Sequence, residues 1–246
     1  MTPSIDRRRY TIEPQPAAPE LYLLRDHATG AAVRLWVGHG NNAVEASLPG
    51  PRGEPVTAIL APEHLEAVRE QPSWWGIPLL FPWPGRIPGG VYEFDGRRFQ
   101  LPDLDAGGNA SHGFARHRPW RVERTTATDD HAAVTSSFSS AEHPQTLQGY
   151  PFPYRVTASY RLDARGLSLH VTVRNEGSAP MPFGFGAHPY FRVPIAARSR
   201  REACLVTVPA ARRWDLPRLA ALGSPGGPGH LSRAEVTAPV AGADDL

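Results

Sequence analysis

Residues 154–173 read YRVTASYRLDARGLSLHVTV, and this stretch decides the fold. Apolar residues occupy every second position on both sides of the turn at residues 163–166: Tyr154, Val156, Ala158, Tyr160 and Leu162, then Leu167, Leu169, Val171 and Val173. Successive side chains of a strand point to opposite faces, so a period of two is typical of a strand with one buried face. The stretch therefore predicts a β-hairpin that packs on a core.

Shorter alternating stretches, bounded by glycine, proline or Asx turns, predict further strands at residues 32–37, 91–94, 120–122 and 133–138. Only residues 61–69 resemble a helical turn or two. The 27 prolines and 23 glycines are spread along the chain, and no long amphipathic helix occurs. The pattern favours an all-β fold, a large antiparallel β-sandwich. The segment 223–229 is expected to be a loop, and no linker or repeat divides residues 1–246.

Composition excludes several classes of function. All 26 basic residues are arginine, against 24 acidic residues, so Schiff-base lysine chemistry and a phosphate-loop lysine are absent. The short arginine clusters at residues 7–9 and 200–201 are typical of solvated surfaces, so a nucleic-acid partner is not expected. No run of about 18 apolar residues occurs, so a membrane span is not expected, and cytoplasmic localisation is the default.

The cysteine content excludes two further kinds of site. Cys204 is the single cysteine, which leaves no disulfide framework and no clustered thiolate metal site. It lies in an apolar stretch and is interpreted as a core residue.

Two of the ten histidines lie in unusual surroundings. His112 lies in GNASHGF (residues 108–114), and His188 lies in FGFGAHPYF (residues 183–191). Glycines let backbone approach a ligand closely, and aromatic rings form the walls of a site. An imidazole gives or takes a proton near neutrality, so a pair beside one bound molecule can act as acid and polarising donor. The other histidines, such as His27, His131 and His143, are expected to be surface or hydrogen-bonded core residues.

A third segment, GIPLLFPWPGRI at residues 76–87, ends on Arg86. An arginine held after stiff prolines can grip two hydroxyls or a carboxylate, although a surface arginine with a packed stem is the commoner case. The aromatics of this region are expected to be mainly core, with one or two stacking on the apolar face of a sugar ring: Trp74, Trp75, Phe81, Trp83 and Phe185. No His or Cys cluster has ligand spacing, so no metal and no cofactor are expected.

Taken in order, these motifs resemble the aldose 1-epimerase (galactose mutarotase) family from about Leu21 to the C-terminus. The matching elements are Gly76 to Ile87, Tyr92-x-Phe94-x-Gly96, Asn109 to Gly113, Tyr150-Pro151 with the following strand, Asn175-Glu176-Gly177 and Gly186-x-His188-Pro189-Tyr190-Phe191. The resemblance implies a β-supersandwich that forms a single galactose mutarotase-like domain. It also implies cofactor-free interconversion of the α and β anomers of a free aldose.

The resemblance also implies roles for single residues. His188 is the acid at the sugar ring oxygen, His112 is a donor that stabilises charge there, and Arg86 holds sugar hydroxyls. Asn109, Tyr190, Asp244 and Asp245 are the further substrate-binding candidates. The family usually has asparagine before this arginine, where the present chain has Gly85.

The family's base is a glutamate on a C-terminal strand that follows an aspartate motif. Here residues 243–246 resemble the start of that motif, and the glutamate strand is absent, since Glu235 lies too early. The expectation is a domain that lacks its C-terminal strands, is less stable or more prone to associate than a complete relative, and turns over near the uncatalysed background. Otherwise another carboxylate serves as base, with Glu235, Asp244 and Asp245 as candidates.

Three functions stay open. The first is an aldose 1-epimerase-like isomerase acting on a small-molecule sugar. The second is a hexose-6-phosphate 1-epimerase of the same superfamily, in which Arg116 or Arg118 helps to hold the phosphate. The third is a noncatalytic carbohydrate-binding protein, favoured by the missing glutamate. A monomer or a homodimer is expected in each case.

Overall fold

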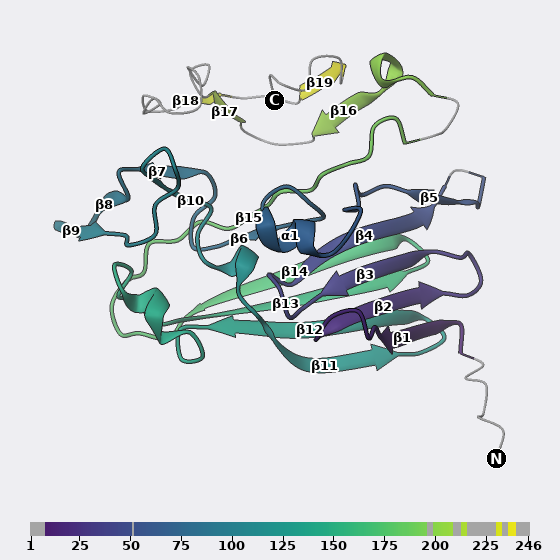
Figure 1. Ribbon diagram of the computed structural model, residues 1–246, viewed down its shortest axis with the longest axis horizontal. Coiled ribbons are helices and arrows are strands. Elements are labelled where there is room, and N and C mark those ends of the chain that lie inside the picture. The colour runs from purple at the N-terminus through teal and green to yellow at the C-terminus, as the bar shows by residue number, and fades with distance from the viewer. Residues whose placement is uncertain are drawn as a thin grey trace.

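Two antiparallel sheets lie face to face in the body of the molecule (Figure 1). The computed structural model describes residues 8–50, 52–195, 199–208, 213–215, 230–232 and 236–239. The first sheet has the order β1 (Tyr10–Pro14), β2 (Leu21–Asp26), β3 (Ala32–Trp36), β4 (Asn42–Pro49) and β5 (Pro55–Thr57). The second has the order β11 (Arg121–Ala127), β12 (His131–Ser139), β13 (Tyr154–Asp163) and β14 (Gly166–Asn175). The predicted all-β antiparallel sandwich is confirmed.

The predicted hairpin supplies the centre of the core. On β13, every second side chain is fully buried, from Tyr154 to Leu162. The alternate apolar side chains of β14 pack against the same cluster. Burying one large apolar side chain stabilises the folded state by about 1.5–3 kcal/mol, so this face alone fixes the register of the hairpin. Arg165 N–H donates to the Asp163 carboxylate at 2.8 Å and closes the turn.

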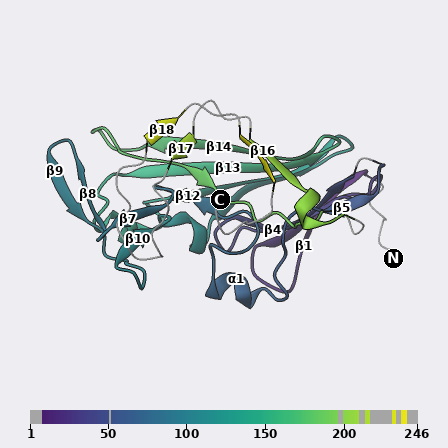
Figure 2. The same ribbon diagram turned by 90° about the horizontal axis from the view of Figure 1, so that it is seen from above.

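A second, smaller core covers the outer face of the first sheet. Figure 2 shows the two sheets as layers, with α1 (Glu66–Glu70) on the side of the first sheet away from the second. Val68 of α1 packs there on Leu21, Trp36 and Val44. The helix begins five residues later than the predicted stretch 61–69 and ends one residue beyond it, at Glu70. Pro62 disfavours helical geometry at Ala61, the first residue of that stretch.

Short paired strands make up the rest of the described chain. β6 (Leu79–Leu80) pairs with β15 (Gly186–Ala187), β7 (Arg86–Pro88) with β10 (Asn109–Ser111), and β8 (Val91–Phe94) with β9 (Arg97–Gln100). β16 (Leu205–Val208) pairs with β19 (Val236–Pro239), and β17 (Arg213–Asp215) with β18 (His230–Ser232). The 3-10 turns are η1 (Ala115–His117), η2 (Pro144–Leu147) and η3 (Arg201–Ala203).

Several sequence predictions need correction. The strand expected at 120–122 is present, but it runs from Arg121 to Ala127 and is longer than predicted. Cys204 is half-buried on a surface segment beside Leu205, which is 67% exposed, so it is not a core residue. Trp74 is exposed rather than core. Arg9 is not simply solvated, since its guanidinium binds the fully buried Asp26 through two hydrogen bonds of 2.9 Å.

Two further expectations concern the loop at residues 223–229 and a membrane span. The loop expected at residues 223–229 lies outside the described residues. Among the described residues, no helix has the length and apolar character needed to cross a membrane.

Candidate functional site

Two strand pairings bring the three candidate segments together. β6 and β15 join the segment that leads to Arg86 to the segment that carries His188, and the His188 N–H donates to the Pro78 carbonyl at 3.0 Å. β7 and β10 place Arg86 opposite Ser111, next to His112. Segments more than 70 positions apart in the chain therefore meet at one place.

His112 is locked by a reciprocal pair of hydrogen bonds to Gly85. Its backbone N–H donates to the Gly85 carbonyl at 2.8 Å, and the Gly85 N–H donates to His112 Nδ1 at 3.0 Å. The backbone of His112 takes the left-handed region at φ 58° to make both bonds. Because Nδ1 accepts a hydrogen bond, the proton of the neutral ring lies on Nε2 and is free to donate outward.

The surroundings of His112 keep it neutral. Burial, together with the nearby positive charge of Arg116, lowers the pKa of His112 to about 4. Arg116 is close because its guanidinium donates to the Ser111 carbonyl at 3.1 Å. At neutral pH, His112 is therefore a neutral hydrogen-bond donor rather than a cation.

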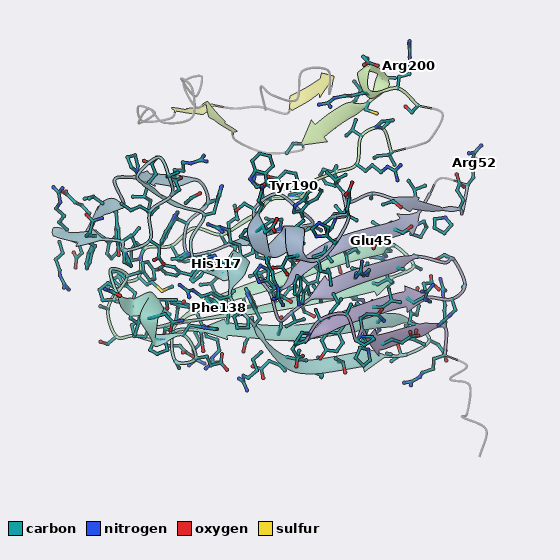
Figure 3. The ribbon with its side chains drawn as sticks, viewed as in Figure 1. Glu45, Arg52, His117, Phe138, Tyr190 and Arg200 are labelled. Carbon is teal, nitrogen blue, oxygen red and sulfur yellow. The ribbon has the colours of Figure 1, made fainter. Side chains whose placement is uncertain are left out.

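His188 lies beside His112 and is exposed. The two ring centroids are 5.9 Å apart, with the planes at 80°. The Tyr190 ring stacks on His188 at 4.9 Å and 22° and limits its rotation (Tyr190 is labelled in Figure 3). Within the described part of the chain, the ring nitrogens of His188 have no hydrogen-bond partner, so they are available to a ligand.

Arg86 has a partner, Asp105, that was not predicted from the sequence. Its Nε donates to Asp105 Oδ2 at 3.2 Å, and Asp105 Oδ1 accepts the N–H groups of Gly107 and Asn109 at 2.9 Å and 3.0 Å. These hydrogen bonds, that from Asn109 first, lower the pKa of Asp105. The only sequence signal for Asp105 was its place before a Gly-Gly turn. The Asn109 amide donates to the Gly107 carbonyl at 3.2 Å, so Asn109 shapes this loop, and its role in sugar binding stays a prediction.

Some of the remaining predicted site residues lie in the described part of the chain, and others do not. Arg118 pairs with Asp103 at 3.7 Å, so its charge is already matched. Asp244, Asp245 and Glu235 lie outside the described residues, and their roles stay predictions. No three His, Cys, Asp or Glu side chains gather as metal ligands within the part of the chain that is described.

The buried histidines predict a pH dependence of stability. Burial lowers the pKa of His112 to about 4 and that of His117 to about 3, against about 6.5 in an unfolded chain. Between these values the unfolded chain binds more protons, so the stability present above about pH 6.5 is lost as the pH falls through this window. Asp26 and Asp105 add to the loss only below about pH 4, because their pKa values are lowered from an unfolded value already near 3.9.

Urea denaturation at about pH 7 and about pH 5 measures this effect, and the free energy of unfolding should be lower at the acid value. Equal stability at both pH values, or a gain at the lower one, would mean that these histidines are accessible to protons in the folded state.

Known protein structures share this architecture. A galactose mutarotase-like protein from Clostridium acetobutylicum superposes with a TM-score of 0.72 at 24% identity, over 86% of this chain and 61% of that one. A galactose 1-epimerase from Lactobacillus acidophilus superposes at 0.63 and 17% identity, over 96% of this chain and 68% of that one. The fold is therefore galactose mutarotase-like.

The family follows from the sequence. The family model for aldose 1-epimerase matches residues 36–218, so the chain belongs to the aldose 1-epimerase family. The uncharacterized protein YihR of Escherichia coli is 34% identical over 114 residues, which are 46% of this chain and 34% of YihR. The chain thus spans about a third of the length of that relative and about three fifths of the Clostridium protein.

Proposed function

We propose that this chain interconverts the α and β anomers of a free hexose by acid- and base-catalysed ring opening, with no cofactor. The observation that carries the proposal is the pair of imidazoles from distant segments, with ring centroids 5.9 Å apart. His112 is a locked neutral donor, and the ring nitrogens of His188 have no hydrogen-bond partner among the residues that the structure describes. Membership of the aldose 1-epimerase family supports the same reaction class.

The reaction needs an acid at the ring oxygen and a base at the C1 hydroxyl. Protonated His188 gives its proton to the ring oxygen as the bond from C1 to that oxygen breaks, and the base takes the C1 hydroxyl proton to form an open-chain aldehyde. His112 donates from Nε2 to the same oxygen while charge changes there. Rotation of the aldehyde and reclosure return both protons and give the other anomer.

The base is a carboxylate in this proposal. Its candidates are Glu235, Asp244 and Asp245. Arg86, held by Asp105, binds sugar hydroxyls in this proposal. A guanidinium that already shares a carboxylate presents its remaining N–H groups to hydroxyl oxygens, while the carboxylate accepts from hydroxyl hydrogens.

Anomer exchange in solution tests the proposal. The exchange rate between α and β anomers of glucose, galactose and glucose 6-phosphate is measured by NMR with and without the protein, alongside sugar binding. Acceleration with the free hexoses supports the proposal. Acceleration with glucose 6-phosphate alone would replace it by a sugar-phosphate epimerase, and saturable binding at the background rate would replace it by a carbohydrate-binding protein.

Arg86→Ala should act mainly through binding. A group that holds hydroxyls contributes to substrate and transition state alike, so KM should rise about 10-fold to 100-fold while kcat changes by less than about threefold. Arg98→Ala is the matched control, because Arg98 is an exposed arginine on the neighbouring hairpin β8–β9. Steady-state kinetics of both variants check this, and an equal effect of the two would remove Arg86 from the sugar site.

A further inference from the structure

His188 lacks a hydrogen bond that would orient its ring. The side chain is exposed, and no described residue bonds to either of its ring nitrogens. An exposed side chain can turn among the staggered wells of its first torsion. A group that transfers a proton works only while it is held toward the reacting atom, and catalytic imidazoles are commonly oriented by a third group. Another contact must therefore orient the ring if His188 is the acid.

The backbone around Tyr190 is held by two earlier segments of the chain. The Tyr190 N–H donates to the Gly76 carbonyl at 2.9 Å, and the Tyr190 carbonyl accepts the Leu60 N–H at 2.7 Å. One turn of the pleat further on, the Arg192 N–H donates to the Ala58 carbonyl at 2.9 Å. The backbone that carries Tyr190 cannot turn without breaking these hydrogen bonds, so the position of its ring is well defined.

Pro189 favours an arrangement with the two rings on the same face of this segment. A proline fixes its own φ and disfavours helical geometry at the residue before it, here His188. In an extended segment, side chains two positions apart point to the same face. The rings of His188 and Tyr190 accordingly stack, with centroids 4.9 Å apart and planes at 22°. The His112 ring lies nearly perpendicular to the same imidazole at 5.9 Å. His188 is therefore bordered by two rings.

The contact between Tyr190 and His188 uses the flat ring of the tyrosine and not its hydroxyl. In the part of the chain that the structure describes, no hydrogen bond engages this hydroxyl. Two roles for Tyr190 can therefore be told apart. A sugar ligand would act through the hydroxyl, whereas an orienting wall would act through the ring.

We propose that Tyr190 is a positioning residue, whose ring holds the His188 imidazole toward the sugar ring oxygen. The catalytic consequence rests on the proposed function, in which His188 is the acid. The orientation of the ring does not, since it can be measured without any turnover.

The mobility of the His188 ring tests the proposal directly. ¹³C relaxation at Cε1 is measured in protein labelled at histidine, with the signal assigned by His188→Asn. The ring should be rigid in the wild type and in Tyr190→Phe, with an order parameter of about 0.85, and mobile in Tyr190→Ala, with a value below about 0.6. Tyr190→Leu keeps apolar volume without a flat ring. It should also loosen His188, and it takes the place of the alanine variant if that variant does not fold.

Kinetics of anomer exchange test the consequence for catalysis. Tyr190→Ala should lower kcat about 10-fold to 100-fold because the acid is misplaced, while KM changes by less than about threefold. Tyr190→Phe keeps the ring and should retain at least about a third of the wild-type kcat. Tyr22→Ala is the matched control, because Tyr22 is another half-buried tyrosine, on β2 of the first sheet, and it should behave as wild type.

The outcomes separate this role from the proposed reaction. If the His188 ring stays equally rigid in Tyr190→Ala, or if Tyr190→Phe loses as much kcat as Tyr190→Ala, Tyr190 is not a positioning residue even where mutarotation is confirmed. If the ring loosens as expected while the wild-type protein does not accelerate exchange, the orienting role of Tyr190 is confirmed and the proposed reaction is disproved.

Discussion

His188→Asn should lower kcat for anomer exchange by about 10²-fold to 10⁴-fold, the usual contribution of a positioned general acid. Asparagine fits the space and keeps a polar group, but it cannot deliver a proton. Binding of the hexose should weaken far less than kcat falls, since Arg86, Asp105 and His112 remain. Polarimetry with α-glucose or α-galactose gives both parameters.

His170→Asn is the matched control for this variant, because His170 is exposed on β14 and lies away from the site. It should behave as wild type. If His188→Asn and His170→Asn have equal and small effects, His188 is not the acid, and the site binds sugar without catalysing anomer exchange.

Gly113→Ala should destabilise the fold by at least about 3 kcal/mol, enough to lower Tm by about 10 °C. Gly113 has φ 67°, and a Cβ on it would overlap the carbonyl of Phe81, which already accepts the Phe114 N–H at 2.7 Å. The chain cannot move away there, because residues 81 and 113 form a bridge that positions the neighbouring His112. Thermal denaturation measures the effect.

Gly108→Ala provides the comparison at nearly the same φ. Gly108 has φ 74°, but a Cβ there would meet no atom within 4 Å, so only the backbone cost of about 1 kcal/mol applies. Equal losses of stability in the two variants would show that the close approach of residues 81 and 113 is not rigid.

The hairpin β13–β14 could be predicted in full from the sequence, whereas β2 and β4 could not. One face of β13 is buried and the other is half-exposed, so its pattern alternates. In β4, Asn42, Ala43 and Val44 are all buried, because the first sheet is covered by the second sheet on one face and by α1 on the other. A strand buried on both faces loses the alternation on which the prediction depends.

The histidine pair was predictable because glycines and aromatic residues mark both segments. Asp105 and His117 were not, since their importance arises from contacts that only the fold creates. Asp105 meets Arg86 across the β7–β10 pairing, and His117 becomes buried in η1 next to two arginines. The Arg86–Asp105 contact joins residues 19 positions apart and leaves no local spacing, and the burial of His117 does not follow from the arginines that flank it in the chain.

Imidazole ¹⁵N NMR during a galactose titration tests the central claim, that His112 and His188 form one sugar site. We expect the signals of both rings to shift together with a single saturation curve at neutral pH. We also expect His112 to be neutral with its proton on Nε2, as its hydrogen bond to Gly85 requires. A titration in which galactose binds while neither ring responds, or in which only one ring does, would contradict the account.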